Sequence, residues 1–309
     1  MVLVEKIEYT SGSTWHAAGL LPLFNMSYSV GKIHKYSVDL YQSLEEETGQ
    51  HVSFHKTGNL RLARNQERMD EYKRYCGTAS TIGVPFEIIG PAEIKNLWPF
   101  AKVDDLVGAL FHPDDGHVAP VDVTMALLKG ARANGAETYS EVEVTAMAQK
   151  PNDEWVVSTN KGDITCDVVI SCTGNYARET GRMVGLELPV VPVEHQFIVT
   201  GPIPELVEYN RAVNPEMAVL RESDASYYMR QEADGLILGP YEKGAPCWAL
   251  DGVPEGFEQE LLPPDLERLE PHIIAAGERV SIFETAGIKD HINCLLYTSP
   301  SPRDATLSR

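Results

Sequence analysis

Apolar and polar residues recur along the chain with two periods, one typical of helices and one typical of strands. Residues 29–47 carry apolar side chains at helical spacing, and Gly49 follows at the position where a helix commonly stops. Pro91 opens the stretch PAEIKNLWP, which predicts a short helix because proline suits a first helical turn. Further helices are predicted at residues 66–81, 121–134 and 258–278.

Strand patterns separate these helices. Residues 2–6, VLVEK, predict a buried strand, and residues 52–63 predict a hairpin that turns at Thr57-Gly58-Asn59. Residues 167–174, DVVISCTG, are almost all apolar, which is typical of a fully buried parallel strand. Beyond Pro189, the stretches VVPVEHQFIVT, SYYMRQ and GLILGPYE predict a second, largely antiparallel sheet.

This order of elements predicts an α/β protein. A doubly wound, Rossmann-like dinucleotide-binding domain is interleaved with an α+β substrate domain built on a mostly antiparallel sheet. We expect the first domain in residues 1–50 and 108–188, and the second in residues 51–107 and 189–293.

Both ends of the chain depart from this plan. Residues 294–309, CLLYTSPSPRDATLSR, do not continue the pattern and resemble a translated sequencing adapter, so we expect a non-native read-through tail. A doubly wound domain has a GxGxxG turn before a strand such as VLVEK, and that spacing is absent from the sequence. We therefore expect a fragment of a longer protein.

Composition restricts the classes of partner. Lys and Arg number 26 against 45 Asp and Glu, and the net charge of −19 repels phosphate groups, which argues against nucleic-acid and anionic-membrane partners. The start, MVLVEKIEYT, is not typical of a signal peptide, and no apolar run approaches the ~18 residues that span a bilayer. We expect a cytoplasmic protein, or one of the mitochondrial matrix in a eukaryote. The cysteines, expected to be free thiols, are Cys76, Cys166, Cys172, Cys247 and Cys294.

Two stretches carry candidate chemistry. Glu5 ends the first strand, where doubly wound folds place a carboxylate that binds the ribose hydroxyls of a dinucleotide. The small-residue turn SGSTWHAAGL follows at residues 11–20 and contains His16. Asp114 and Asp115 of the stretch PDDGH are interpreted as turn formers. No histidine or cysteine has metal-like spacing to them, so we expect no metal site.

Several segments, in the same order, resemble the FAD-dependent amine oxidoreductases of the D-amino-acid-oxidase superfamily. Within it, the likeness is to the dimethylglycine and sarcosine dehydrogenases, and it runs from about residue 2 to residue 293. The segments are GSTWHAAGL, KIH, LEEETG, PDDGH, EHQFIVT, YYMRQE, GPYE and GVPEGF.

The resemblance implies oxidative N-demethylation of a small N-methylated amino acid such as dimethylglycine or sarcosine, with hydride transfer from an N-methyl carbon to FAD. It leaves three alternatives open: a dehydrogenase that passes electrons to an acceptor flavoprotein, an oxidase that uses oxygen, and a non-catalytic regulatory paralogue. It also allows a tetrahydrofolate-binding domain outside this chain.

The resemblance assigns roles residue by residue. His16 matches the histidine that is bonded covalently to the flavin, although a histidine at a helix start can equally bind only backbone. His195 and Tyr227 match the catalytic pair near the substrate nitrogen; the alternative for each is a core side chain with satisfied hydrogen bonds. His34 and His117 also match family histidines, and we expect structural roles for both. The expected cofactor-binding residues are Glu5, Ser11, Gly12, Ser13, Thr14, His16, Val144, Thr173 and Gly174.

Overall fold

The computed structural model describes residues 1–212 and 214–298, and its main feature is a large mixed sheet. The strands of this sheet are β3 (Asn59–Ala63), β4 (Glu87–Ile89), β5 (Gly108–His112), β11 (Val191–Thr200), β12 (Val219–Glu222), β13 (Tyr227–Glu232), β14 (Gly235–Pro240) and β15 (Ile288–Thr298). They lie in the order β15-β11-β14-β13-β12-β3-β5-β4. Of the neighbouring pairs, β12 and β3 are parallel and the others antiparallel, so the mostly antiparallel sheet is confirmed.

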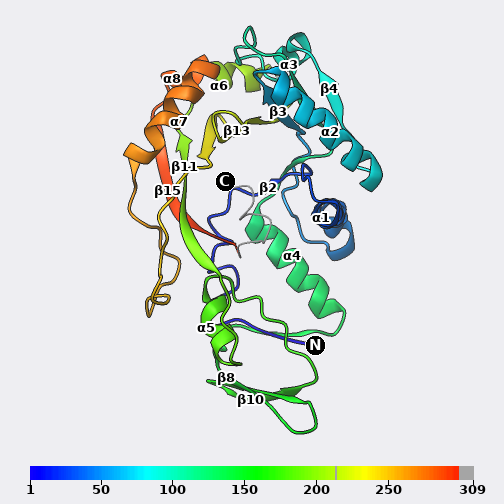
Figure 1. The fold of residues 1–309 in the computed structure, drawn as a ribbon, viewed down its shortest axis with the longest axis vertical. Coiled ribbons are helices and arrows are strands. Elements are labelled where there is room, and N and C mark those ends of the chain that lie inside the picture. Colours follow the sequence, from blue (N-terminus) through cyan, green and yellow to red (C-terminus); the bar gives the residue numbers. More distant parts are fainter. Residues whose placement is uncertain (213, 299–309) are drawn as a thin grey trace.

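Helices pack on both faces of the large sheet (Figure 1). One face is covered by α3 (Pro91–Leu97), α6 (Pro204–Arg211), α7 (Leu266–Arg279) and α8 (Ser281–Glu284). The other face carries α1 (Tyr28–Thr48) and α2 (Gln66–Ile82), next to β3 and β5. As the sequence predicts, α1 stops at Gly49, which is left-handed and donates its N–H to the Glu45 carbonyl. No helix among the described residues has the length and apolarity of a membrane span.

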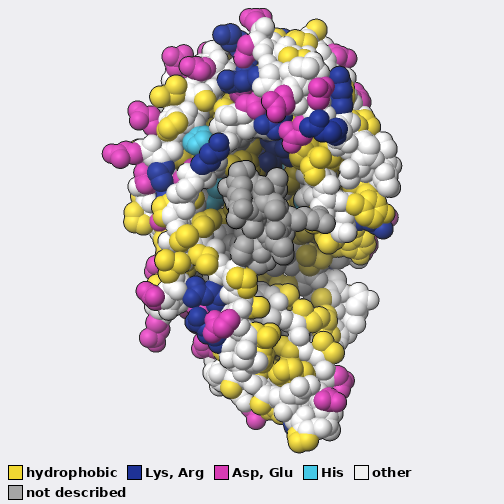
Figure 2. Space-filling model, in the orientation of Figure 1, with side chains coloured by type: hydrophobic (Ala, Val, Ile, Leu, Met, Phe, Trp, Pro, Cys, Tyr) yellow, Lys and Arg dark blue, Asp and Glu magenta, His cyan; other side chains and the backbone are white. Residues whose placement is uncertain are grey.

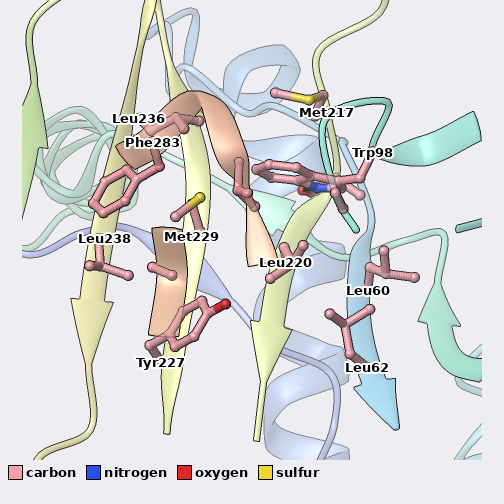
Figure 3. Close-up of a cluster of buried hydrophobic side chains, with 14 of the residues drawn as sticks. Leu60, Leu62, Trp98, Met217, Leu220, Tyr227, Met229, Leu236, Leu238 and Phe283 are labelled. Carbon is pink, nitrogen blue, oxygen red and sulfur yellow. Dashed lines mark hydrogen bonds between the residues drawn. The ribbon is translucent and has the colours of Figure 1, made fainter. Parts of the chain in front are cut away.

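The main core lies between the large sheet and the first of these helical layers. Side chains alternate along a strand, so Leu60, Leu220 and Met229 point from three neighbouring strands into this core, where they meet Trp98 (Figure 3). Trp98 is fully buried and donates its indole N–H to the Ala218 carbonyl at 2.6 Å, so its polar atom is satisfied. Each large side chain buried here stabilises the fold by about 1.5–3 kcal/mol.

A smaller region is built from other elements of residues 1–50 and 108–188, where we expected the dinucleotide-binding domain. Its elements are β1 (Val2–Val4), α4 (Pro120–Ala133), β7 (Glu137–Tyr139), β8 (Val144–Gln149), β9 (Trp155–Thr159), β10 (Gly162–Cys166), the 3₁₀ turn η1 (Gly174–Tyr176) and α5 (Ala177–Arg182). β1 and β7 pair in parallel, whereas β8, β9 and β10 form an antiparallel meander. A short antiparallel pair, β2 (Leu20–Leu21) with β6 (Gly116–His117), connects the opening turn to the large sheet.

Charged and apolar side chains are distributed unevenly over the surface. Figure 2 shows acidic and basic side chains interspersed over the end of the molecule that carries α3 and α8, whereas hydrophobic side chains are more frequent toward the end with the meander. The charged end is typical of a solvated surface, because opposite charges there lie near one another without forming one basic patch.

Two strand predictions are wrong. Residues 52–63 do not form a hairpin, because β3 pairs with β5 and β12 rather than with the residues just before it. Residues 167–174 form no strand, and Val168 and Ile170 are 71% and 79% exposed. Apolar composition alone does not make a strand, and no described strand pairs with this segment.

Two strands lie at or across the expected domain boundaries. β5 begins at residue 108, where we expected the dinucleotide-binding domain to resume, yet it pairs in register with β3 and belongs to the large sheet. β15 continues through residues 294–298, beside β11, and so crosses into the expected read-through tail. The remainder of that expected tail, residues 299–309, lies outside the described residues.

Candidate functional site

A row of polar side chains lies on the sheet face opposite the main core; we call it the site face. It consists of Arg61, Arg221, Tyr228 and His195, which come from four different strands, together with Tyr241 just after β14. Each of the strand residues alternates with core residues on its own strand, which is why all four point away from the core. A cavity of about 200 Å³ opens here, lined by Arg61, Arg221, Ser223, Ser226, Tyr227 and Tyr241.

Arg61 and Arg221 form the positive centre of the site face. They occupy one register position of the parallel β3–β12 pair, and each is only 8% exposed. Neither forms an ion pair with another described residue, and both Nε atoms are buried without a partner. Burial, and to a smaller extent the charge of Arg221, lower the pKa of Arg61 to about 10. The buried carboxyl group of Asp115 acts on Arg61 through its charge but forms no direct ion pair with either arginine. Two buried guanidinium groups without a direct ion-pair partner among the described residues are suited to bind an anion such as a carboxylate.

Aromatic rings continue the row beyond the arginines. Arg221 donates from Nη1 to the Tyr241 hydroxyl at 2.7 Å, and the Tyr241 ring lies 5.8 Å from both the His195 and Tyr228 rings. Burial lowers the pKa of His195, so its imidazole is neutral at pH 7 and can accept a proton. Burial raises the pKa of Tyr228, which keeps its phenol protonated. The row therefore combines an anion site with one proton acceptor.

Tyr227 borders the cavity but does not belong to this row of side chains. It is 1% exposed and points into the main core (Figure 3), where its hydroxyl donates to Glu222 Oε2 at 2.6 Å. The predicted pair of His195 with Tyr227 is therefore not formed, because adjacent residues of a strand point to opposite faces. Tyr228 takes the place beside Tyr241 and His195, with its ring against Gly239, where a Cβ atom would lie 2.1 Å from Tyr228 Cζ.

The turn that contains His16 approaches the site face. Ala18 and Leu20, just after it, pack against Phe197 and Tyr228. Burial lowers the pKa of His16 and thus favours the neutral, nucleophilic imidazole. Its Nδ1 atom and the hydroxyl oxygen of Ser13 are buried without a hydrogen-bond partner among the described residues.

The rest of this turn is partly closed by its own hydrogen bonds. Ser11 is buried and donates from Oγ to the Glu8 carbonyl at 2.7 Å, and the Thr14 carbonyl accepts the Ala17 N–H at 3.3 Å. Gly12 is exposed, and a Cβ atom built on it would meet no atom within 4 Å. Backbone is therefore accessible at Gly12, which suits a close approach by a ligand.

Backbone hydrogen bonds hold Glu5 beside the segment that leads into β8, which begins at Val144. The Glu5 N–H donates to the Tyr139 carbonyl at 2.9 Å, and its carbonyl accepts the N–H of Val142, two residues before Val144. Its carboxylate accepts a hydrogen bond from the Ile7 N–H at 3.2 Å. Its oxygens retain acceptor capacity beyond this one bond, as a ribose-binding carboxylate requires.

The 3₁₀ turn that follows Thr173 also lies near this position. Gly174 begins the turn with a φ of 54°, and the ring of Tyr176 lies 4.8 Å from Lys6 Nζ. Thr173 is exposed, and its hydroxyl lies 3.1 Å from that of Ser171. Tyr176 of this turn therefore lies beside Lys6, the residue after Glu5, although residues 167–174 do not form the strand that we expected there.

Sequence reasoning missed Arg61, Arg221 and Asp115. Asp115, which we interpreted as a turn former, is fully buried. Burial raises its pKa to about 7. The Leu23 N–H, which donates to its Oδ1 atom, has a smaller effect in the opposite direction. Asp114 does lie in the turn, where it pairs with Lys56 at 2.6 Å. The signal for the arginines was a charged residue that directly follows a leucine in each of the short strands NLRLA and VLRE.

Comparison with known proteins identifies the family. A family model described as "DAO: FAD dependent oxidoreductase" matches residues 1–299. The mitochondrial dimethylglycine dehydrogenase of Rattus norvegicus is 42% identical over 305 residues, which are 97% of this chain and 35% of that protein. The mitochondrial sarcosine dehydrogenase of Mus musculus is 34% identical over 297 residues, covering 94% of this chain and 31% of that protein. The chain thus spans about a third of the length of these relatives.

A solved structure agrees with this fold. The L-proline dehydrogenase from P.horikoshii superposes with a TM-score of 0.81 at 25% identity, over 97% of this chain and 75% of that one. The family match covers nearly the whole chain and includes both the His16 turn and the site face. The chain belongs to the DAO family of FAD-dependent oxidoreductases.

Proposed function

We propose that the protein of which this chain is part oxidises a small N-methylated amino acid, such as dimethylglycine or sarcosine, with bound FAD. The observation that carries the proposal is the buried pair Arg61 and Arg221, on the same sheet face against which the turn after His16 packs. This arrangement supplies a carboxylate site near the turn that matches the flavin-linked histidine of the family.

The residues of the opening turn fit a flavin dinucleotide. The unpartnered polar atoms of Ser13 and His16 are buried, which is costly unless a ligand provides their partners. Glu5 would bind the ribose, residues 11–14 would follow the pyrophosphate and ribityl chain, and Val144, Thr173 and Gly174 would border the adenosine end. His16 would bond covalently to the 8α-methyl carbon of the flavin, because a neutral imidazole is a nucleophile at pH 7. This bond would replace one C–H bond of the methyl group and the N–H bond of the imidazole, and the flavin ring would take up the two electrons and two protons. Bound FAD would supply the two-electron acceptor for the reaction.

The site face fits the substrate. The cavity of about 200 Å³ is smaller than the ~300–1,000 Å³ pockets of drug-sized ligands, which suits a molecule of a few heavy atoms. Arg61 and Arg221 would bind its carboxylate and fix the position of the methylated nitrogen.

His195 and Tyr228 would act at the nitrogen end. Hydride leaves the N-methyl carbon only when the nitrogen lone pair is free, so the ammonium proton must first be removed. The unprotonated ring nitrogen of His195 would accept that proton, and Tyr228 would orient the nitrogen through its protonated hydroxyl.

The whole protein's partners and products follow from the same proposal. The iminium product would hydrolyse to formaldehyde or transfer its carbon to tetrahydrofolate in a region outside this chain. Electrons would pass to an acceptor flavoprotein, with an oxidase that uses oxygen as the alternative. The dimethylglycine and sarcosine dehydrogenases described above are mitochondrial proteins. We therefore propose the mitochondrial matrix as the compartment of this protein in a eukaryote, and the cytoplasm otherwise.

An anaerobic titration tests this function. The purified protein is loaded with FAD and mixed with dimethylglycine, with sarcosine, or with trimethylamine, which has N-methyl groups but no carboxylate. We expect the amino acids to bleach the flavin absorbance and release formaldehyde, and trimethylamine to leave it unchanged. A protein that binds FAD but is bleached by none of them contradicts the proposal. A protein that stays colourless with FAD favours the non-catalytic paralogue.

A further inference from the structure

Three potential metal ligands converge at a second place in the fold, away from the arginine pair. His55 Nδ1 lies 2.7 Å from Glu216 Oε2, and His117 Nε2 lies 2.6 Å from Glu216 Oε1. The ligand atoms of the three residues all lie within 4.8 Å of one another. They come from the segment before β3, from β6 and from the segment before β12, so only the folded chain brings them together.

The backbone fixes the two histidines relative to each other. His55 and His117 exchange two N–H···O bonds, of 2.8 and 3.0 Å, and their rings stack at 4.6 Å. Gly116 makes this approach possible, because a Cβ atom at that position would lie 2.0 Å from the His55 carbonyl oxygen. Both imidazoles therefore present a nitrogen on the same side before any ligand arrives.

The third ligand is held by the large sheet. Glu216 lies just before β12, which begins at Val219. The Val219 N–H donates to the carbonyl of Gly58 at 3.0 Å, and Gly58 lies three residues after His55, so this bond holds the two segments together. Both oxygens of the Glu216 side chain are directed at the histidines, Oε2 at His55 Nδ1 and Oε1 at His117 Nε2, so the carboxylate lies between the two imidazoles. A carboxylate placed in this way can act as the third ligand of a metal ion.

The chemistry of the three groups matches one class of ion. Two imidazole nitrogens and one carboxylate are a known ligand set for Zn²⁺, with a further position left open. Tetrahedral coordination at ~2.1 Å would separate the ligand atoms by about 3.4 Å, which is more than the present hydrogen-bond distances of 2.7 and 2.6 Å. The side chains of His55 and Glu216 are 48% and 27% exposed, so small torsions of these two can open the site around the more buried His117.

A cavity provides the open position. It has a volume of about 360 Å³ and lies beside the cluster, with walls that include His55, Lys56, Asn96, Tyr209 and Glu216. An ion held by the three ligands would face this cavity and could retain water or bind a small anionic ligand there.

We propose that His55, His117 and Glu216 form a binding site for a divalent transition-metal ion of the zinc type, open on one side to the adjacent cavity. The site is separate from the proposed flavin reaction, and an ion there would join three segments of the chain that lie far apart in sequence.

Metal titration of the full chain tests the site without reference to activity. The purified protein is first stripped with a chelator and then titrated with Co²⁺, whose visible absorption reports coordination, followed by displacement with Zn²⁺. We expect one-to-one binding. Replacing one of three ligands, in His55→Ala or Glu216→Gln, should weaken it by about 100-fold. His55→Ala is the decisive variant, because its side chain is half exposed and its loss leaves the core intact.

The control is His51→Ala, which removes a more exposed histidine that pairs only with Glu45 at 2.8 Å. This variant should bind Co²⁺ as the unchanged protein does. The proposal is overturned if neither ion binds the unchanged protein, if His55→Ala binds as tightly, or if His51→Ala weakens binding equally. Circular dichroism of each variant verifies that the fold is retained.

Discussion

Arg61 of β3 and Arg221 of β12 lie directly opposite each other in a parallel strand pair, with both guanidinium groups buried. Burial and the nearby like charge both act against the charged form of Arg61, whose pKa falls to about 10. Leaving two buried cations together is costly unless an anion offsets them. The pair therefore favours a ligand with a carboxylate, and the substrate class that we propose follows from this relationship.

Replacing Arg221 should separate anion binding from folding. In Arg221→Met we expect dimethylglycine to bind with a free energy weaker by about 1.5–3 kcal/mol, which is roughly tenfold to 100-fold in Kd. A spectral titration of the FAD-loaded protein measures this change. The matched control is Arg230→Met, which removes an equally buried arginine of the same face whose charge is already paired with Glu232 at 2.6 Å. If dimethylglycine binding weakens equally in both variants, the loss reflects the net charge of the protein and not a contact with Arg221.

The two adjacent tyrosines of β13 should respond in opposite ways to the loss of a hydroxyl. Tyr227→Phe removes a hydrogen bond to the buried Glu222, so the free energy of unfolding should fall by about 1–3 kcal/mol with kcat/KM little changed. Tyr228→Phe should leave the unfolding free energy nearly unchanged and lower kcat/KM. Denaturant unfolding and steady-state kinetics on the same preparations measure both. The reverse pattern would return the catalytic role to Tyr227.

The covalent role of His16 can be tested without turnover. We expect His16→Ala to bind FAD that is released on denaturation, whereas the flavin of the unchanged protein should stay with the polypeptide. Fluorescence of the denatured protein after gel electrophoresis is the measurement. The control variant His51→Ala should retain its fluorescence. Flavin that dissociates from the unchanged protein as well would refute the covalent link and leave only non-covalent FAD binding.

Asp115 should make the stability of the protein depend on pH. Its pKa is raised from 3.8 to about 7, so the folded protein retains a proton that the unfolded chain has already lost over this interval. Stability due to this group is therefore greatest below about pH 4 and falls as the pH rises toward 7, by up to about 1.4 kcal/mol per pH unit.

Asp115→Asn keeps an acceptor for the Leu23 N–H and removes the titration. Relative to the unchanged protein, the variant should therefore gain stability between pH 5 and pH 7, which urea unfolding at a series of pH values within this interval measures. A stability difference that stays constant with pH, or that shrinks as the pH rises, would show that Asp115 is ionised in the folded protein at acidic pH.

Helices were predictable from the sequence because the spacing of apolar residues that forms them lies within a short stretch of chain. The helix expected at residues 29–47 is α1, Tyr28–Thr48, because its apolar spacing and the glycine after it act within a few turns of chain. Residues 66–81 correspond in the same way to α2, which ends at Ile82. Residues 167–174 failed because a buried strand needs a neighbour, and pairing depends on chain far away in sequence.

Part of the candidate site was also predictable. The motifs around Glu5 and His16 indicated a flavin dinucleotide, and the family that they resemble is the family to which the chain belongs. The anion site and the proposed metal site were not predictable in this way. His55 and Glu216 are 161 residues apart, and no spacing rule connects two such positions.

The sequence by itself determined the family, the helix periods and the fact that Tyr227 and Tyr228 face opposite ways, because strand alternation is a local property of the backbone. Only the tertiary structure decided which of the two enters the core. That choice depends on the strands that pair with β13 and on the helices that cover one face, α7 and α8 among them. The same long-range packing set Arg61 beside Arg221 and His55 beside His117.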